Sequence, residues 1–154
     1  LCVDRVSLTY EAEPVGAPDS PAFLNAAVAV TTALPPDVLK RDVLRPIEAR
    51  LGRQRTANSN APRTIDIDIA MVGDLVLRDE ARSIEVPDPN IARYAHLAFP
   101  LRDLAPDVRH PALQRTLGQL ADALGTVDGI RVREDVDLNA ALSDRPDPSD
   151  VEIR

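Results

Sequence analysis

The sequence has little cysteine and no long apolar run. The single Cys2 cannot form an internal disulfide, and no cysteine and histidine cluster has the spacing of a zinc site, so a reducing, cytoplasmic compartment is expected. No stretch approaches the roughly 20 apolar residues that a membrane helix requires, and no basic and apolar leader opens the chain. These absences predict a cytoplasmic protein with no membrane partner.

Net positive charge and glycine-rich phosphate loops are also missing. The formal net charge of −7 argues against non-specific nucleic-acid binding, and the six glycines supply neither GxxxxGK[ST] nor GxGxxG. Nearly all basic residues are arginines, of which Arg50, Arg53, Arg55 and Arg63 fall in one short stretch. Arginine forks match phosphate oxygens, so this stretch either receives a small polyphosphate or is an ordinary solvated charge run.

The first half of the chain alternates between strand, loop and helix patterns. Alternating apolar residues predict a strand at 6–10, which ends at a turn-rich loop, and the apolar run 23–32 predicts an internal strand paired with it. A helix is expected from Pro35 to Gly52. Pro46 lies inside this helix, where proline costs several kcal/mol or kinks the axis.

The second half predicts shorter elements around one core. We expect a strand at 64–72 with a hairpin partner at 75–77, helices at 91–101 and 116–124, the latter with a Thr116 and Gln119 capping box, and a closing strand at 129–132. This order favours an α+β, ferredoxin-like sandwich, with helices packed on a mainly antiparallel sheet. One domain is expected at 1–143, followed by a disordered tail at 144–154.

Two carboxylates stand at alternate positions of the segment Thr64-Ile65-Asp66-Ile67-Asp68-Ile69. In a strand the isoleucines face the core, while Asp66 and Asp68 share the other face. Their repulsion costs roughly 1 to 3 kcal/mol at intermediate dielectric, which a divalent cation would reverse. Mg²⁺ fits because it prefers one or two carboxylates with waters and phosphate oxygens. The alternative interpretation is the wet face of an amphipathic strand.

Five short segments in a fixed order resemble one family. They are EPVG at 13–16, FLNAAV at 23–28, IEARLGR at 47–53, PRTIDIDI at 62–69 and PLRDLAPD at 100–107. In this order and spacing the chain resembles 6-hydroxymethyl-7,8-dihydropterin pyrophosphokinase, an enzyme of folate synthesis. The resemblance implies that ATP gives its terminal pyrophosphoryl group to the pterin hydroxymethyl oxygen and that AMP is released.

The same resemblance implies roles for residues around the carboxylates. Asp66 and Asp68 would hold two Mg²⁺ ions that bridge the triphosphate of ATP, and Arg53 and Arg63 would stabilise charge on the migrating group. Glu48 and the backbone near Ile69 would lie along the nucleotide site.

For the pterin, the resemblance implies a second set of residues. Asn25 would hydrogen-bond the heterocycle, Phe23 and His96 would lie beside it, and the loop around Val15 and Gly16 would close above. Each has a simpler alternative, because Asn25 could satisfy a neighbouring backbone group, Phe23 could be core and His96 a partly exposed helix residue. Since imidazole changes charge near neutral pH, His96 would make pterin binding pH-sensitive.

Several positions depart from the family pattern. Asp88 stands where these enzymes usually carry histidine, His96 stands where a phenylalanine usually stacks on the pterin, and a polar run at 56–60 replaces bulkier residues of a candidate lid. The strand, turn and helix with which the family normally opens are not found before residue 6.

These departures keep three functions open. The chain is an active pterin pyrophosphokinase, with another folate enzyme fused to it or beside it. Alternatively, it is a catalytically inactive nucleotide-binding or assembly module of the same fold. A third, weaker interpretation is a different Mg²⁺-dependent nucleotidyl transferase, against which the retained Asn25 and the EPVG loop argue.

Overall fold

The computed structural model describes residues 1–13, 21–54 and 64–140. The chain forms two compact units. The first contains Thr32–Pro89 and His110–Gln114 together with Leu1, and the second contains Cys2–Thr31, Asn90–Arg109 and the chain from Arg115. The antiparallel strands and the helices confirm the α+β class, whereas the ferredoxin-like arrangement stays a prediction. No helix in the described ranges is long and apolar enough to cross a membrane.

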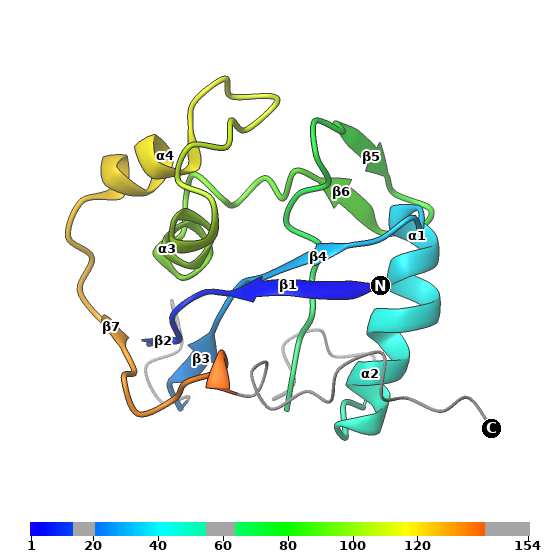
Figure 1. Cartoon of the computed structure of the whole chain (residues 1–154), viewed down its shortest axis with the longest axis horizontal. Coiled ribbons are helices and arrows are strands. Elements are labelled where there is room, and N and C mark those ends of the chain that lie inside the picture. Colours follow the sequence, from blue (N-terminus) through cyan, green and yellow to red (C-terminus); the bar gives the residue numbers. More distant parts are fainter. Residues whose placement is uncertain (14–20, 55–63, 141–154) are drawn as a thin grey trace. The chain divides into compact units, whose positions relative to one another are not determined.

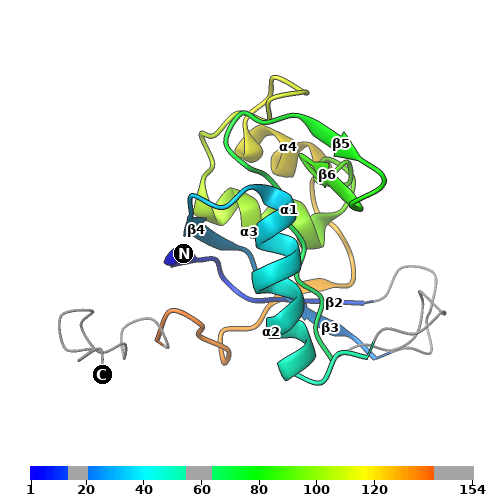
Figure 2. The ribbon, with the colours of Figure 1, turned by 90° about the vertical axis from the view of Figure 1, so that its right-hand side faces the viewer.

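A single irregular helix dominates the first unit. It runs through α1 (Pro36–Val38), the π-helical segment η1 (Leu39–Leu44) and α2 (Arg45–Arg50) without a break in the ribbon (Figure 2). The expected helix is therefore present. The π-helical turn precedes Pro46, and the amide of Arg45 bonds the carbonyl of Lys40, five residues earlier. Proline lacks the donor that a regular α-helix needs at this point, so a wider turn next to it accommodates the ring.

The helix ends at a glycine that sets up the next segment. Gly52 adopts φ of 86°, a conformation that other residues rarely take. The amides of Leu51, Gly52 and Arg53 donate to carbonyls of the last helical turn. Arg53 therefore follows directly from a rigid helix end.

The predicted hairpin at 64–72 and 75–77 is wrong. Among the described residues of this unit, the strands are β5 (Leu77–Asp79) and β6 (Ile84–Val86), which pair antiparallel with each other. The alternation of exposed and half-buried residues holds at 64–69, whereas residues 70–72 are all half-buried, and the segment 64–72 is not a strand. The Ile67 amide donates instead to the Glu48 side chain, and the Ala70 carbonyl accepts from the amide of Asp88. Alternation alone predicted the faces correctly and the pairing incorrectly.

The second unit is built on a long hairpin that is interrupted on both sides (Figure 1). β1 (Cys2–Val6) pairs antiparallel with β4 (Val28–Thr31), and β2 (Tyr10–Ala12) pairs antiparallel with β3 (Phe23–Asn25). The expected antiparallel pairing is present, but residues 7–9 of the expected strand at 6–10 lie in neither β1 nor β2, and the expected strand at 23–32 is divided into β3 and β4. Between the two ladders, the Ser7 hydroxyl accepts a hydrogen bond from the Ala27 amide, and the Ser7 amide donates to the Ala27 carbonyl.

Two helices and one further strand complete the described part of this unit. β7 (Ile130–Val132) pairs with the other edge of β2, as expected for a closing strand. Helix α4 (Leu117–Leu124) has the expected Thr116 and Gln119 capping box. Helix α3 (Ala95–Leu104) begins four residues later than expected, because residues 91–93 form a turn. The two helices pack together, and their buried side chains contribute to the core: Ala95, Ala98, Leu104, Leu117, Leu120 and Ala121.

Candidate functional site

In the first unit, a buried carboxylate joins the helix end to the aspartate segment. Glu48 lies on α2, and its side chain is 3% exposed. Its Oε1 accepts a hydrogen bond from Nη1 of Arg53 at 2.6 Å and another from the amide of Ile67 at 2.8 Å. Glu48 therefore fixes both the arginine and the backbone between Asp66 and Asp68. A buried carboxylate is stable only when such partners satisfy it.

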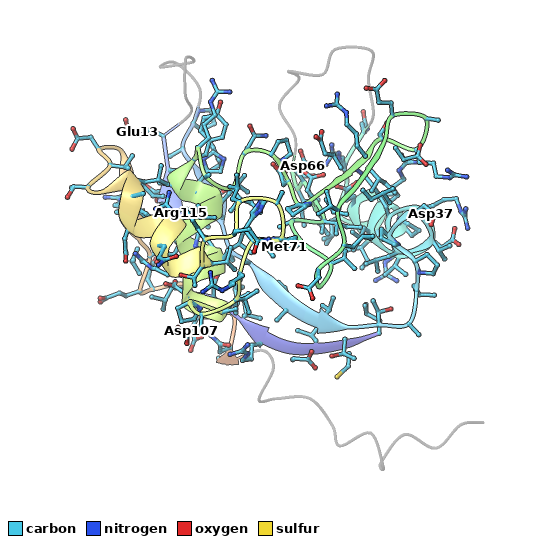
Figure 3. The ribbon with its side chains drawn as sticks, turned by 90° about the horizontal axis from the view of Figure 1, so that it is seen from above. Glu13, Asp37, Asp66, Met71, Asp107 and Arg115 are labelled. Atoms are coloured by element: carbon cyan, nitrogen blue, oxygen red, sulfur yellow. The ribbon has the colours of Figure 1, made fainter. Side chains whose placement is uncertain are left out.

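Arg53 links this carboxylate to the first aspartate. Its guanidinium also hydrogen-bonds the carboxylate of Asp66 and, at 3.1 Å, the carbonyl of Ile65. The bond to Asp66 raises the pKa of Arg53, so the guanidinium keeps its charge at any working pH. Figure 3 labels Asp66 on the segment that carries the two aspartates. Glu48, Arg53 and Asp66, three of the expected site residues, thus lie in one cluster.

Several negatively charged side chains lie near the carboxylate of Asp68. Partial desolvation of its carboxylate, then the negative charge of Asp66, raise the pKa of Asp68, and Asp88 and Glu48 add to the rise. The ammonium of Lys40 opposes this shift, with Nζ 3.8 Å from Oδ1 of Asp68. Negative charges that raise the pKa of a neighbouring carboxylate also make a bound cation favourable.

The donor set suits a hard divalent cation. Within residues 1–13, 21–54 and 64–140, no three carboxylate, histidine or cysteine side chains are grouped so as to hold a metal ion. A cation at Asp66 and Asp68 would have two carboxylates from the protein, and its other positions would be left to water and phosphate oxygens. Mg²⁺ is usually held in this way, so the residues present fit it.

Lys40 was not expected at this site. It lies on the π-helical segment η1 and also donates to the carbonyl of Ser83 at 2.8 Å. A helical period of 3.6 does not give side-chain directions on a π-helical turn, so the sequence pattern carried no signal for its position. Lys40 also lines an open cavity of about 240 Å³ with Asp37, Arg41, Arg45 and Arg82. Acidic neighbours pair with two of these arginines, in the Arg41–Asp42 and Arg82–Asp37 contacts.

Phe23, Asn25 and His96, three of the residues expected at the pterin, lie in the second unit. The Phe23 and His96 rings contact each other at a centroid distance of 5.7 Å and an interplanar angle of 76°. The expected neighbourhood of these two rings is therefore present, but they do not face each other as parallel plates. His96 stacks instead on Tyr94, at 5.3 Å and 14°. Tyr94 was missed, and its only sequence signal is its position two residues before His96.

Asn25 makes a local contact. Its Nδ2 donates to the carbonyl of Phe23 at 3.3 Å, the simpler role that the sequence left open for a strand asparagine. A bond made through the nitrogen leaves the amide oxygen for another partner. Val15, Gly16 and Arg63, the candidate lid at 56–60 and the tail at 144–154 lie outside the described residues. His110 lies next to a turn, and its Nδ1 accepts from the amide of Leu113.

Comparison with known proteins gives one consistent family. Residues 2–106 match the family model described as 7,8-dihydro-6-hydroxymethylpterin-pyrophosphokinase (HPPK). The chain is 39% identical over 107 residues to a 2-amino-4-hydroxy-6-hydroxymethyldihydropteridine pyrophosphokinase of Pseudomonas aeruginosa, covering 69% of this chain and 63% of that protein. It is 30% identical over 118 residues to a protein of the same name from Aquifex aeolicus, covering 76% and 71%.

The chain also matches part of a much longer protein. The Folate synthesis bifunctional protein of Arabidopsis thaliana is 36% identical over 105 residues, which cover 68% of this chain and 21% of that protein. The chain thus spans less than two thirds of the Pseudomonas relative and about a fifth of the Arabidopsis one. The matched family segment covers more than half of the chain and contains both residue clusters, so the chain belongs to the 7,8-dihydro-6-hydroxymethylpterin-pyrophosphokinase (HPPK) family.

Proposed function

We propose that this chain transfers pyrophosphate from ATP to 6-hydroxymethyl-7,8-dihydropterin, giving AMP and the pterin diphosphate in folate biosynthesis. The observation that carries the proposal is the family match over residues 2–106, which includes the charged cluster at Glu48, Arg53 and Asp66. ATP is a substrate in this reaction and is not regenerated.

The reaction requires charge stabilisation more than covalent help. The pterin hydroxymethyl oxygen forms a bond to the β-phosphorus of ATP, the bond from that phosphorus to the α,β-bridging oxygen breaks, and AMP leaves with the electron pair. The hydroxyl proton passes to solvent. Negative charge grows on the leaving oxygen, where a preorganised guanidinium is most effective. Arg53, already fixed by Glu48, supplies this charge, and we assign the same role to Arg63.

We assign Asp66 and Asp68 to two Mg²⁺ ions. When bound, Mg²⁺ would neutralise charge on the triphosphate and fix its orientation. The contribution of the chain is to hold the two carboxylates on one face of an extended segment, through the bond from the Ile67 amide to Glu48. The backbone near Ile69 then continues along the nucleotide.

For the pterin we assign Asn25 to the heterocycle edge and Phe23 and His96 to its faces. Aromatic and imidazole rings bind flat heterocycles by stacking, and the amide oxygen of Asn25 can accept from the amino group of the pterin. Val15 and Gly16 would close over the ligand. The contact between the Phe23 and His96 rings in the second unit supports this assignment.

The alternatives remain an inactive module of the same fold and another nucleotidyl transferase. The charged cluster favours the enzyme over the inactive module, because an assembly module has no need of a paired arginine and two aspartates at one place. The name of the Arabidopsis relative supports a second folate enzyme fused to this one or beside it. The single Cys2 favours a reducing compartment such as the cytoplasm.

The proposal is tested by AMP release. The purified chain is supplied with ATP, Mg²⁺ and 6-hydroxymethyl-7,8-dihydropterin, and the control omits the pterin. Pterin-dependent AMP is expected, together with one pterin diphosphate for each AMP. Folded protein that binds ATP but releases no AMP would support the inactive module. AMP release that requires a different acceptor would support another transferase.

A further inference from the structure

Three rings of the second unit contact one another, one pair face to face and one pair edge to face. Tyr94 and His96 are stacked at 5.3 Å and 14°, whereas Phe23 meets His96 at 5.7 Å and 76°. On the Tyr94 ring lies the guanidinium of Arg93, 5.4 Å from its centroid. Two of these contacts are thus face contacts within one short segment, and the third is an edge contact between that segment and strand β3.

This geometry restricts how a flat ligand could be held. A heterocycle between two rings requires both to lie nearly parallel to its plane. Phe23 and His96 are close to perpendicular, so one of them has to turn before both can stack on the same ligand. Tyr94 already holds the plane of the His96 ring, whereas the Phe23 ring meets its neighbour only through an edge contact.

The backbone also holds Tyr94 more firmly than Phe23. Tyr94 is the N-cap of α3, and its carbonyl accepts hydrogen bonds from the amides of Leu97 and Ala98 at 3.1 and 3.0 Å. The buried Ala95 and Ala98 anchor this turn in the core. Phe23, in contrast, lies on a three-residue strand at the edge of its sheet, and it is 39% exposed.

We propose that Tyr94 is a positioning residue that fixes the imidazole plane of His96, so that His96 is the preset wall of the pterin site and Phe23 is the ring that turns onto the ligand. This inference rests on the proposed function. Its physical advantage is preorganisation, because a ring held before binding loses less conformational freedom when the ligand arrives.

The test compares Tyr94→Phe with Tyr94→Leu, and Tyr94→Met serves if the leucine variant does not fold. Pterin affinity is measured by fluorescence titration, and ATP affinity by calorimetry. Tyr94→Phe keeps the ring and is expected to bind pterin within about 2-fold of wild type. Removal of the ring is expected to weaken pterin binding roughly 3- to 10-fold, with ATP affinity unchanged. The expected kinetic effect is a higher KM for pterin with the same kcat.

Two further measurements separate positioning from general damage. In a His96→Ala background, Tyr94→Leu should add no further loss, because its effect acts through the imidazole. In the ligand-free chain, the His96 ring protons should show an upfield ring-current shift in wild type and Tyr94→Phe that disappears in Tyr94→Leu.

The outcomes distinguish a failure of this inference from a failure of the proposed function on which it rests. If wild type binds pterin and Tyr94→Leu binds it equally well, the positioning role is wrong and the pyrophosphokinase proposal stands. If wild type releases AMP only with another acceptor and binds no pterin, both proposals are overturned. An additive effect of the Tyr94 and His96 variants would also overturn the positioning role.

Discussion

The two units of this chain hold their candidate site residues by different physical means. In the first unit, Glu48, Arg53 and Asp66 form a continuous set of ion pairs and charge-assisted hydrogen bonds. In the second, Phe23, His96 and Tyr94 contact one another through ring faces and edges. A charged cluster depends on every member, because removal of one leaves another unpaired. In an aromatic cluster, removal of one ring leaves no charge unpaired.

The two units also differ in the kind of polar group that they bury. The side chain of Arg53 is 13% exposed and that of Glu48 is 3% exposed, so the ion pair of the first unit lies largely out of water. The second unit buries a neutral group instead, the phenol of Tyr10, which donates a hydrogen bond to Asp103 at 2.8 Å. We therefore expect charge substitutions to have large effects in the first unit and smaller, pH-dependent effects in the second.

The largest effect is expected at the paired aspartates. Asp66→Asn and Asp68→Asn each remove one negative charge without changing the shape of the side chain. Pterin-dependent AMP release should fall by roughly 1,000-fold or more, since a cation site loses half of its protein charge. The measurement is initial AMP release at saturating ATP and pterin.

The matched control for these variants is Asp74→Asn, at an exposed turn of the same unit. Its activity should equal that of wild type, and all three variants should keep the wild-type circular dichroism. Normal turnover by either Asp66→Asn or Asp68→Asn would overturn the assignment of these carboxylates to Mg²⁺.

A smaller effect, on stability, is expected at Glu48. Glu48→Ala leaves the Arg53 guanidinium without its buried partner and the Ile67 amide without an acceptor. The free energy of unfolding should fall by about 3 kcal/mol, which urea titration measures. In the control Glu80→Ala, an exposed pair with Arg78 is lost, and no measurable change is expected. Equal stabilities of the two variants would show that the cluster at Glu48 is not a structural ion pair.

The smallest effect is expected at Tyr10 and depends on pH. Burial, followed by the hydrogen bond and charge of Asp103, raises the pKa of Tyr10 to about 12. Below pH 10 the phenol is protonated in both folded and unfolded chains, so its contribution is complete. Between about pH 10 and 12 the unfolded chain releases the proton first, and stability falls by about 2 kcal/mol in total.

Urea titration of wild type and Tyr10→Phe at pH 8, 9.5 and 11 isolates this contribution. The difference between the two proteins should shrink as pH rises, because only the wild type has the titrating phenol. Parallel pH profiles would mean that the phenol of Tyr10 is not held in its neutral form, and the expectation of a pH-dependent effect in the second unit would be wrong.

Short local patterns determined much of what was predicted correctly. The Thr116 and Gln119 capping box fixed the start of α4, because both partners lie within one turn. The alternation in the aspartate segment fixed which side chains are exposed. The helix through Pro46 was also expected, although the π-helical turn that accommodates the proline was not.

Only the tertiary structure decided which distant groups meet. The aspartate segment finds its partner in the side chain of Glu48 instead of a neighbouring strand, and Lys40 reaches Asp68 from a turn whose side-chain directions no regular period predicts. The stacking of Tyr94 on His96 depends on the extended N-cap of α3. By itself the sequence determined the capped start of α4 and the alternating exposure at 64–69, since these depend on nearby residues. Pairing across the chain depends on three-dimensional packing, and it was settled only there.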